Sequence, residues 1–175
     1  MKKVTLSETA LFVKMVPDLS GINNEEIKKF SIKQIAEHSD KIDNYGEYPC
    51  SFNKHTSWLS WFIKNEMDAY HEINIEQLSE HLLKQDHNEI TLKRKHIDFF
   101  SPKNTPDFTS IYFMDDASNK LVLEFNDHKY RNLSWEIPIE KGKCVVFNSD
   151  VSFYFSKNID KKILTHYVIK WHHLK

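Results

Sequence analysis

Glycine, cysteine and long apolar runs are all scarce in this sequence. Its three glycines argue against a glycine-lined phosphate loop. Cys50 and Cys144 are fewer than a disulfide framework needs, so we expect a reducing compartment, most simply the cytoplasm. No apolar run approaches the roughly 20 residues that span a bilayer, and we expect no membrane partner.

An excess of positive charge is missing as well. Lysine and arginine number 24 against 25 aspartate and glutamate residues, and the formal net charge is −1. The basic residues are spread along the chain, whereas nucleic-acid binding draws most of its affinity from a concentrated basic face. We therefore expect no nucleic-acid partner.

What the sequence does contain is enough apolar material for one folded domain. Hydrophobic residues make up 40% of the 175 residues, aromatic residues 13% and charged residues 28%. This composition is ordinary for a globular protein, and the length suits a single domain over residues 1–175. We find no repeat, low-complexity tract or linker that would divide the chain.

The first half of the sequence is predicted to be mainly helical. Asn23 followed by Glu25 and Glu26 is typical of a helix N-terminus. Apolar residues then recur at helical spacing in three successive segments. The elements predicted before residue 89 are edge strands at 4–6 and 11–15, helices at 23–38 and 57–70, a loop at 39–53, and a third helix that starts at Asn74 and carries Ile75, Leu78, Leu82 and Leu83.

After about residue 89 the hydrophobic period changes. Short β-branched or aromatic segments follow one another, separated by Pro, Asn, Asp and Gly. The predicted strands are 91–99, 108–114, 120–125, 133–139, 143–147, 151–155 and 163–171. So many short strands are typical of a sandwich, barrel or jelly roll. We predict an α+β protein in which the mainly helical residues 1–89 support a β-rich part at 90–171.

His96-Ile97-Asp98 is the segment of the predicted strands with the clearest chemical meaning. Alternate residues of a strand share a face, so His96 and Asp98 are expected to project together into the mouth of the fold. An imidazole and a carboxylate are two of the three ligands of a facial triad, which holds Fe(II) and leaves positions for oxygen and a co-substrate. Chance produces about one such pair in a chain of this composition, and His38-Ser39-Asp40 is a second copy. By itself the pair therefore also fits a polar strand face.

The order of elements after His96 carries a family resemblance. An aromatic strand ending at Asp115-Asp116 comes first, then the apolar strand 120–125, then Pro138 with the stretch Gly142-Lys143-Cys144-Val145-Val146-Phe147, and a closing strand at 163–171. In this order and spacing, residues 90–171 resemble the Fe(II)/2-oxoglutarate-dependent oxygenases, particularly their prolyl-4-hydroxylase-like branch. The resemblance implies a C-terminal double-stranded β-helix, a cupin-like jelly roll, with the N-terminal helices packed on it.

The same resemblance implies Fe(II), with His96 and Asp98 as metal ligands. The family's third ligand is a distal histidine shortly after the Gly-x-x-x-x-Phe strand. Residues 150–155 contain no histidine, so the chain departs from the family at this position. Asp150 is the one candidate replacement there. Two protein ligands hold a metal less firmly than three, so we expect the metal site to be weakened or lost.

The resemblance also implies 2-oxoglutarate, whose far carboxylate the family binds with an Arg or Lys on the closing strand. Lys161 or Lys162 falls near that position. If the more apolar face of 163–171 points inward, alternation turns Lys162 outward. Arg94 is the alternative anchor, because it shares a strand face with His96.

Two functional hypotheses stay open. One is an active dioxygenase that uses Fe(II) and 2-oxoglutarate to hydroxylate a protein or a small molecule. The other is a diverged, non-catalytic jelly roll without either cofactor, which binds a protein partner or serves as a structural subunit. The retained His96 and Asp98 favour the first, and the missing distal histidine favours the second. We predict the second, with no 2-oxoglutarate turnover at an ordinary enzymatic rate.

Overall fold

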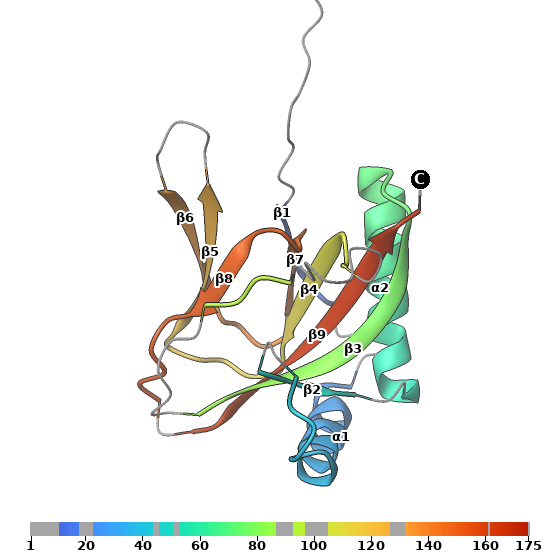
Figure 1. Ribbon diagram of the computed structural model, residues 1–175. Helices are drawn as coiled ribbons and strands as arrows, with labels where there is room; N and C mark the ends of the chain where they lie inside the picture. The colour runs from blue at the N-terminus through green and yellow to red at the C-terminus, as the bar shows by residue number, and fades with distance from the viewer. Residues whose placement is uncertain are drawn as a thin grey trace, which may run out of the picture.

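The computed structural model describes residues 11–17, 23–43, 46–50, 53–86, 93–96, 105–126, 132–160 and 162–174. Its strands form two antiparallel sheets (Figure 1). The larger sheet has the order β1-β7-β4-β9-β3-β2 and the smaller one the order β6-β5-β8. The strands are β1 (Leu11–Met15), β2 (Glu47–Pro49), β3 (Ile75–Gln85), β4 (Phe108–Phe113), β5 (Lys120–Asn126), β6 (Asn132–Pro138), β7 (Lys143–Asn148), β8 (Ser152–Phe155) and β9 (Leu164–His173).

Two helices cover one face of the larger sheet. α1 (Asn24–Glu37) begins as predicted, since the Asn23 side chain accepts hydrogen bonds from the backbone N–H groups of Glu25 and Glu26. α2 (Lys54–His71) runs beside β3 (Figure 1). Its buried side chains include Leu59, Ile63 and Met67, while Trp58 and Trp61 are exposed. Neither described helix is long and apolar enough to cross a membrane.

The larger sheet is buried on both faces, and this decides which side chains reach the interior of the jelly roll. On β9, Tyr167, Ile169 and Trp171 pack with the helices in one apolar cluster. Val168 belongs to a second cluster with residues of the smaller sheet, such as Leu121. Even-numbered side chains of β9 therefore face the smaller sheet, because successive residues of a strand point to opposite sides. The apolar odd-numbered face, expected to point into the jelly roll, packs against the helices instead.

The third predicted helix is wrong, because residues 75–85 form β3 between β2 and β9. Leu82 packs with the helices, whereas Leu83 packs between the two sheets. Adjacent apolar residues on opposite faces blur the alternation of a strand buried on both sides. The pairing with β9 also shifts its register between Gln77 and Ser79, and this bulge at Leu78 changes which positions point to each face. The resulting spacing imitates a helix.

The other predicted elements have clear outcomes. Strands at 11–15, 108–114, 120–125, 133–139, 143–147, 151–155 and 163–171 are confirmed as β1 and β4–β9, with small changes of boundary. The prediction at 4–6 lies outside the described residues. Of 91–99 the structure describes only 93–96, where Arg94 makes an isolated bridge to Phe153 of β8. The first half also supplies β1, β2 and β3 to the larger sheet, so it is less helical than expected.

Candidate metal centre

His96 lies between the two sheets and is almost completely buried. Its ring is 5.1 Å from the ring of Phe153, which comes from the smaller sheet. On the other side it contacts Thr109 of β4 in the larger sheet. The structure thus places His96 between the sheets, buried rather than at an open mouth of the fold, and outside the named strands. Asp98 lies outside the described residues, so its pairing with His96 stays a prediction.

Both ring nitrogens of His96 are engaged in hydrogen bonds. Nε2 donates to Oε1 of Glu47 over 2.7 Å, because an ionised carboxylate can only accept. Nδ1 lies 2.9 Å from the Thr109 hydroxyl, which in turn contacts the hydroxyl of Ser149 over 2.8 Å. These contacts fix the ring orientation. In this arrangement His96 supports Glu47 and has no free lone pair directed at a metal.

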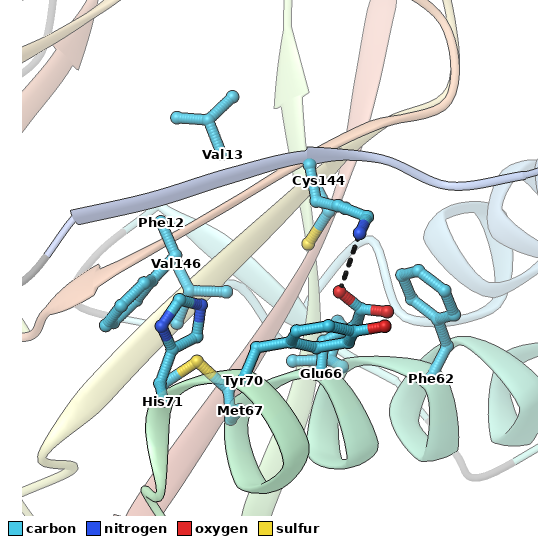
Figure 2. A pocket seen from close by; sticks show the side chains of 11 residues that line it. Phe12, Val13, Phe62, Glu66, Met67, Tyr70, His71, Cys144 and Val146 are labelled. Carbon is cyan, nitrogen blue, oxygen red and sulfur yellow. Dashed lines mark ion pairs between the residues drawn. The ribbon is translucent and has the colours of Figure 1, made fainter.

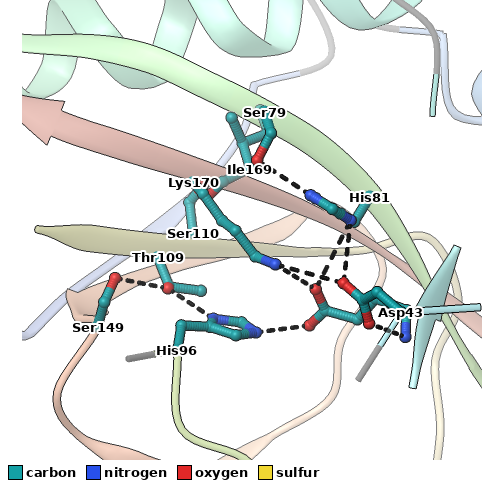
Figure 3. A network of polar contacts seen from close by, with 10 residues as sticks. Asp43, Ser79, His81, His96, Thr109, Ser110, Ser149, Ile169 and Lys170 are labelled. Atoms are coloured by element: carbon teal, nitrogen blue, oxygen red, sulfur yellow. Dashed lines mark hydrogen bonds and ion pairs between the residues drawn. The ribbon is translucent and has the colours of Figure 1, made fainter. Parts of the chain in front are cut away.

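Glu47 and His96 belong to a group of polar residues that we call the interior cluster: Asp43, Glu47, His81, His96 and Lys170 (Figure 3). Strand alternation places Glu47, His81 and Lys170 on the interior face. Lys170 follows Val168 by two residues on β9, and His81 precedes Leu83 by two on β3, where both reference residues pack between the sheets. Glu47 pairs directly opposite Leu83. The cluster is nearly closed to solvent, with Asp43, 26% exposed, as its most open side chain.

Three potential ligand groups of the interior cluster face one another. One ligand atom each from Asp43, Glu47 and His81 lie within 4.8 Å of one another. His81 Nδ1 is 3.5 Å from Asp43 Oδ2 and 4.0 Å from Glu47 Oε2. Ligands about 2.1 Å from a common ion are separated by about 3–4 Å, depending on the angle between them. The three groups therefore need only a small contraction to share one ion.

In each of these three side chains, the polar atom that points away from the shared space is held by a neighbouring group. Asp43 Oδ1 accepts a hydrogen bond from the backbone N–H of Glu47. Glu47 Oε1 accepts from His96, and His81 Nε2 lies 3.0 Å from the Ser79 hydroxyl. Among the described residues, Glu47 Oε2 and His81 Nδ1 have no hydrogen-bond partner although both are buried. Outer hydrogen bonds of this kind orient the ligands of metal sites.

Lys170 is the cation that stands among these groups. Its Nζ lies 2.9 Å from Glu47 Oε2 and 3.7 Å from Asp43 Oδ2 (Figure 3). The ion pair is made at an angle that gives Glu47 Oε2 no hydrogen bond. Lys170 is 7% exposed, so its charge is compensated inside the protein rather than by water. The ammonium group thus pairs with the two carboxylates that would hold a metal ion.

The charges of the interior cluster favour an ionised Glu47 and a neutral His81. Burial acts to raise the pKa of Glu47, but the contact and hydrogen bond with His96 and the charge of Lys170 lower it to about 2, with a smaller effect of His81 in the same direction. Burial lowers the pKa of His81 to about 4, and the Lys170 ammonium adds to this shift. At neutral pH both groups are in the protonation state that binds a metal.

The donor set fits a divalent transition metal once Lys170 moves aside. Imidazole suits iron and its neighbours, and carboxylates suit harder ions such as Mn(II). One imidazole and two carboxylates leave positions open for other ligands, as a facial arrangement requires. This candidate set differs from the predicted one, because Asp43, Glu47 and His81 could supply the ligand atoms, with His96 hydrogen-bonded to Glu47. The assignment of His96 and Asp98 as metal ligands stays a prediction.

Of the two predicted anchors for a co-substrate, Lys162 is exposed and Arg94 is buried. Lys162 precedes β9, is exposed, and donates to the backbone carbonyl of Asp116. Arg94 is buried beside β8 through its bridge to Phe153. Asp150, the candidate replacement ligand, is an exposed turn residue after β7. The basic residue of β9 that faces the interior cluster is Lys170. The assignment of Lys162 and Arg94 to a co-substrate stays a prediction.

His166 is a further buried histidine, which was not singled out in the sequence. It lies on the interior face of β9, stacked on Phe155 with ring centroids 4.4 Å apart. Neither ring nitrogen has a hydrogen-bond partner among the described residues. Burial lowers the pKa of His166 to about 3, and the charge of Arg94 acts in the same direction. An unpaired buried imidazole of this kind destabilises the folded state.

Replacing His166 with Phe should stabilise the protein, and more so in acid. The pKa of His166 is lower in the folded chain than in the unfolded chain, which therefore binds one more proton between about pH 6.5 and pH 3. As the pH decreases through that window, the free energy of unfolding falls by about 1.4 kcal/mol per pH unit. The substitution His166→Phe removes this contribution. Urea unfolding at pH 7 and pH 5 measures both effects. His81 is present in both proteins, so its own contribution to the pH dependence of stability is the same in each. Equal pH dependence in the two proteins would contradict the account.

The ligand groups could not be found from local sequence. Asp43 and Glu47 lie in the segment 39–53 that reads as loop, and His81 lies in the segment misassigned as helix. Their convergence depends on β2 pairing with β3, a contact between residues more than thirty positions apart. The spacing of Asp43 and Glu47, four residues apart beside Gly46, was the one local signal, and it is too common to be specific.

Comparisons with known proteins give a match in structure alone. No family profile and no curated protein matches the sequence. Among solved structures, the non-haem α-ketoglutarate-dependent epimerase SnoN from nogalamycin biosynthesis matches with a TM-score of 0.65 and 9% identity, over 93% of this chain and 76% of that one. The collagen prolyl hydroxylase of Paramecium Bursaria Chlorella virus-1 matches with a TM-score of 0.60 and 8% identity, over 100% and 99%.

A third structural neighbour was solved with iron bound. It is HygX from Streptomyces hygroscopicus, with a TM-score of 0.55 and 9% identity over 94% of this chain and 82% of that one. Identities this low establish the fold and leave the chemistry open. Two helices on a pair of antiparallel sheets, together with these neighbours, confirm the fold that the resemblance implied. The chain has the double-stranded β-helix fold of the Fe(II)/2-oxoglutarate-dependent oxygenases.

Proposed function

We propose that this protein is an oxygenase that binds Fe(II) through Asp43, Glu47 and His81 and uses 2-oxoglutarate as its co-substrate. The observation that carries the proposal is the convergence of three ligand groups inside the jelly roll: Glu47 Oε2 and His81 Nδ1 lie 4.0 Å apart beside Asp43, and neither atom makes a hydrogen bond among the described residues. Glu47 Oε2 is ion-paired with Lys170, whereas the buried Nδ1 of His81 accepts no hydrogen bond, which costs about 1–3 kcal/mol that a bound ion would remove. The proposal reverses our sequence-based preference for a non-catalytic protein.

The chain's own residues divide the work of such a site. Bound Fe(II) would supply the redox chemistry with oxygen that neither carboxylate nor imidazole can provide. Glu47 and Asp43 hold the positive charge, and His81 contributes a neutral nitrogen. His96 keeps Glu47 Oε1 occupied, so that Oε2 is the oxygen presented to the ion. Thr109 and Ser149 fix the His96 ring from its other side.

Lys170 has two successive partners in this proposal. In the metal-free protein it neutralises Glu47 and Asp43. Asp43 and Glu47 would hold a bound ion in its place, and Lys170 would then be free to pair with a carboxylate of the co-substrate. This is the role that the resemblance assigns to a basic residue of the closing strand. Metal and co-substrate binding are thereby coupled through one side chain.

Succinate formation tests the enzymatic part of the proposal. Protein loaded anaerobically with Fe(II) and then supplied with 2-oxoglutarate and oxygen should produce succinate. His81→Ala should reduce the rate at least about tenfold by removing the nitrogen ligand. His172→Ala, a change on the partly exposed end of β9, is the matched control and should keep the rate. Absence of succinate from the metal-loaded wild-type protein would refute the enzymatic assignment.

A second candidate function rests on Lys170 itself. The Lys170 ammonium group already compensates the charges of Glu47 and Asp43 inside the protein. A lysine in the place of a metal ion is what we expect of a jelly roll that has lost its catalytic role. The interior beside the cluster is filled by Phe113, Phe147 and Phe153, in agreement with a packed core. Such a protein would bind a protein partner or act as a structural subunit. Metal binding by the purified protein distinguishes it from the oxygenase.

A further inference from the structure

A cavity lies on the opposite side of the larger sheet from the interior cluster. It has a volume of about 380 Å³, lies between β1, β7 and α2, and is partly open to solvent (Figure 2). Side chains of β7 alternate between the two sides: Cys144 and Val146 line this cavity, whereas Val145 and Phe147 pack between the sheets. The two sites are therefore separated by the sheet itself.

The walls of the cavity are aromatic and apolar. Rings of Phe12, Phe62, Tyr70 and His71 line it, and the Phe12 and His71 rings touch with centroids 4.1 Å apart. The base consists of buried side chains, including Met67, Cys144 and Val146. Ligand sites are usually concave and mainly apolar, with a few polar groups, and measure roughly 300–1,000 Å³. The cavity meets each of these conditions.

One ion pair spans the cavity from β1 to α2. Lys14 Nζ lies 3.0 Å from Glu66 Oε2, and the same ammonium group lies 5.2 Å from the centre of the Tyr70 ring (Figure 2). Because Lys14 and Glu66 compensate each other, the polar part of the cavity carries no net charge. The pair is partly exposed, so a charged ligand would compete with it for one of the two groups, whereas a neutral ligand leaves it intact.

We propose that this cavity binds a small neutral aromatic molecule with two or three fused or linked rings. A cavity of roughly 150 Å³ accommodates one benzene ring, so the observed volume suits a molecule about twice that size. A polypeptide segment does not fit, because the Lys14–Glu66 pair crosses the space between strand and helix. The four lining rings offer stacked and edge-on contacts to flat ligands.

Binding of 2-naphthol tests this inference without using any activity of the protein. In wild-type protein labelled with ¹³C at the methionine methyl groups, 2-naphthol should shift the signal of Met67, which lines the cavity. Met114, buried on the same side of the sheet but away from the cavity lining, should not shift. 2-Naphthoate, of similar shape but negatively charged, should bind at least about tenfold more weakly in calorimetry. Shifts of Met114 without Met67, no binding, or tighter binding of 2-naphthoate would each overturn the proposal.

A variant that fills the cavity provides a second, independent test of the proposal. Val146→Trp places an indole in the space and should reduce 2-naphthol affinity at least about tenfold. Ile159→Trp, at a residue that is 71% exposed and outside the cavity lining, adds the same side chain and should leave affinity unchanged. Equal loss in both variants would contradict the assignment. If Val146→Trp does not fold, the methionine shifts of the wild-type protein decide the question.

Discussion

Replacing Lys170 with Met should destabilise the metal-free protein by about 3–5 kcal/mol and at the same time strengthen metal binding at least about tenfold. Glu47 is completely buried, and losing its 2.9 Å ion pair with Lys170 leaves its charge compensated only by the neighbouring histidines, chiefly by the hydrogen bond from His96. The same change removes the cation that competes with a metal for Glu47 and Asp43. Urea unfolding without metal and Mn(II) titration by calorimetry measure the two effects.

The opposite signs of these two effects make the Lys170 experiment specific. Lys157→Met, a matched change at an exposed lysine, should alter neither quantity. Saturating Mn(II) should raise the unfolding temperature of the Lys170→Met protein more than that of the wild-type protein, because the ion replaces the lost charge. Destabilisation without any gain in Mn(II) affinity would favour the second candidate, in which Lys170 permanently replaces the metal.

Replacing Glu47 with Gln should lower the free energy of unfolding on the order of 3 kcal/mol at neutral pH and weaken metal binding at least about tenfold. Burial opposes ionisation, but His96, Lys170 and His81 bring the pKa of Glu47 down to about 2. Its pKa is thus lower in the folded chain than in the unfolded chain, near 4.5. The stabilisation is complete above about pH 4.5 and is lost as the pH falls toward 2. Glu47→Gln removes this part of the acid sensitivity.

Unfolding by urea at pH 7, 4.5 and 3 measures the contribution of Glu47. The wild-type protein should approach the stability of the variant as the pH falls, and Glu76→Gln, an exposed change on β3, should behave like wild type. Mn(II) affinity should fall at least about tenfold in Glu47→Gln alone. A stability difference that persists unchanged at pH 3 would mean that the folded-state pKa of Glu47 is not lowered.

The fold was readable from the second half of the sequence because its strands are short, aromatic or β-branched, and separated by turn residues. β4, for example, follows Pro106 and Asp107 and precedes Asp115. The prediction for the residues of β3 was wrong for a physical reason. Leu82 and Leu83 pack into two different cores, and a bulge at Leu78 interrupts the alternation of the strand. The alternation of apolar and polar residues identifies a strand that is buried on one face, and it is absent from a strand that is buried on both faces.

The candidate site was predictable only in its location. His96 was expected at the mouth of the jelly roll, and the structure buries it between the two sheets. Its neighbours Glu47 and His81 arrive through the pairing of β2 with β3, which no local pattern encodes. Lys170 was overlooked because the alternation of β9 was assigned to the wrong side: both faces are buried, and the more apolar one packs on the helices. Hydropathy alone does not distinguish two buried faces.

The position of a bound metal tests the central claim most directly. Crystals grown with Mn(II) should show an anomalous scattering peak coordinated by the carboxylates of Asp43 and Glu47 and by Nδ1 of His81. The Lys170 ammonium should have moved away from Glu47, and His96 should keep its hydrogen bond to Glu47 Oε1. A peak on His96 Nε2 and Asp98, or no peak with Lys170 still paired to Glu47, would contradict the account.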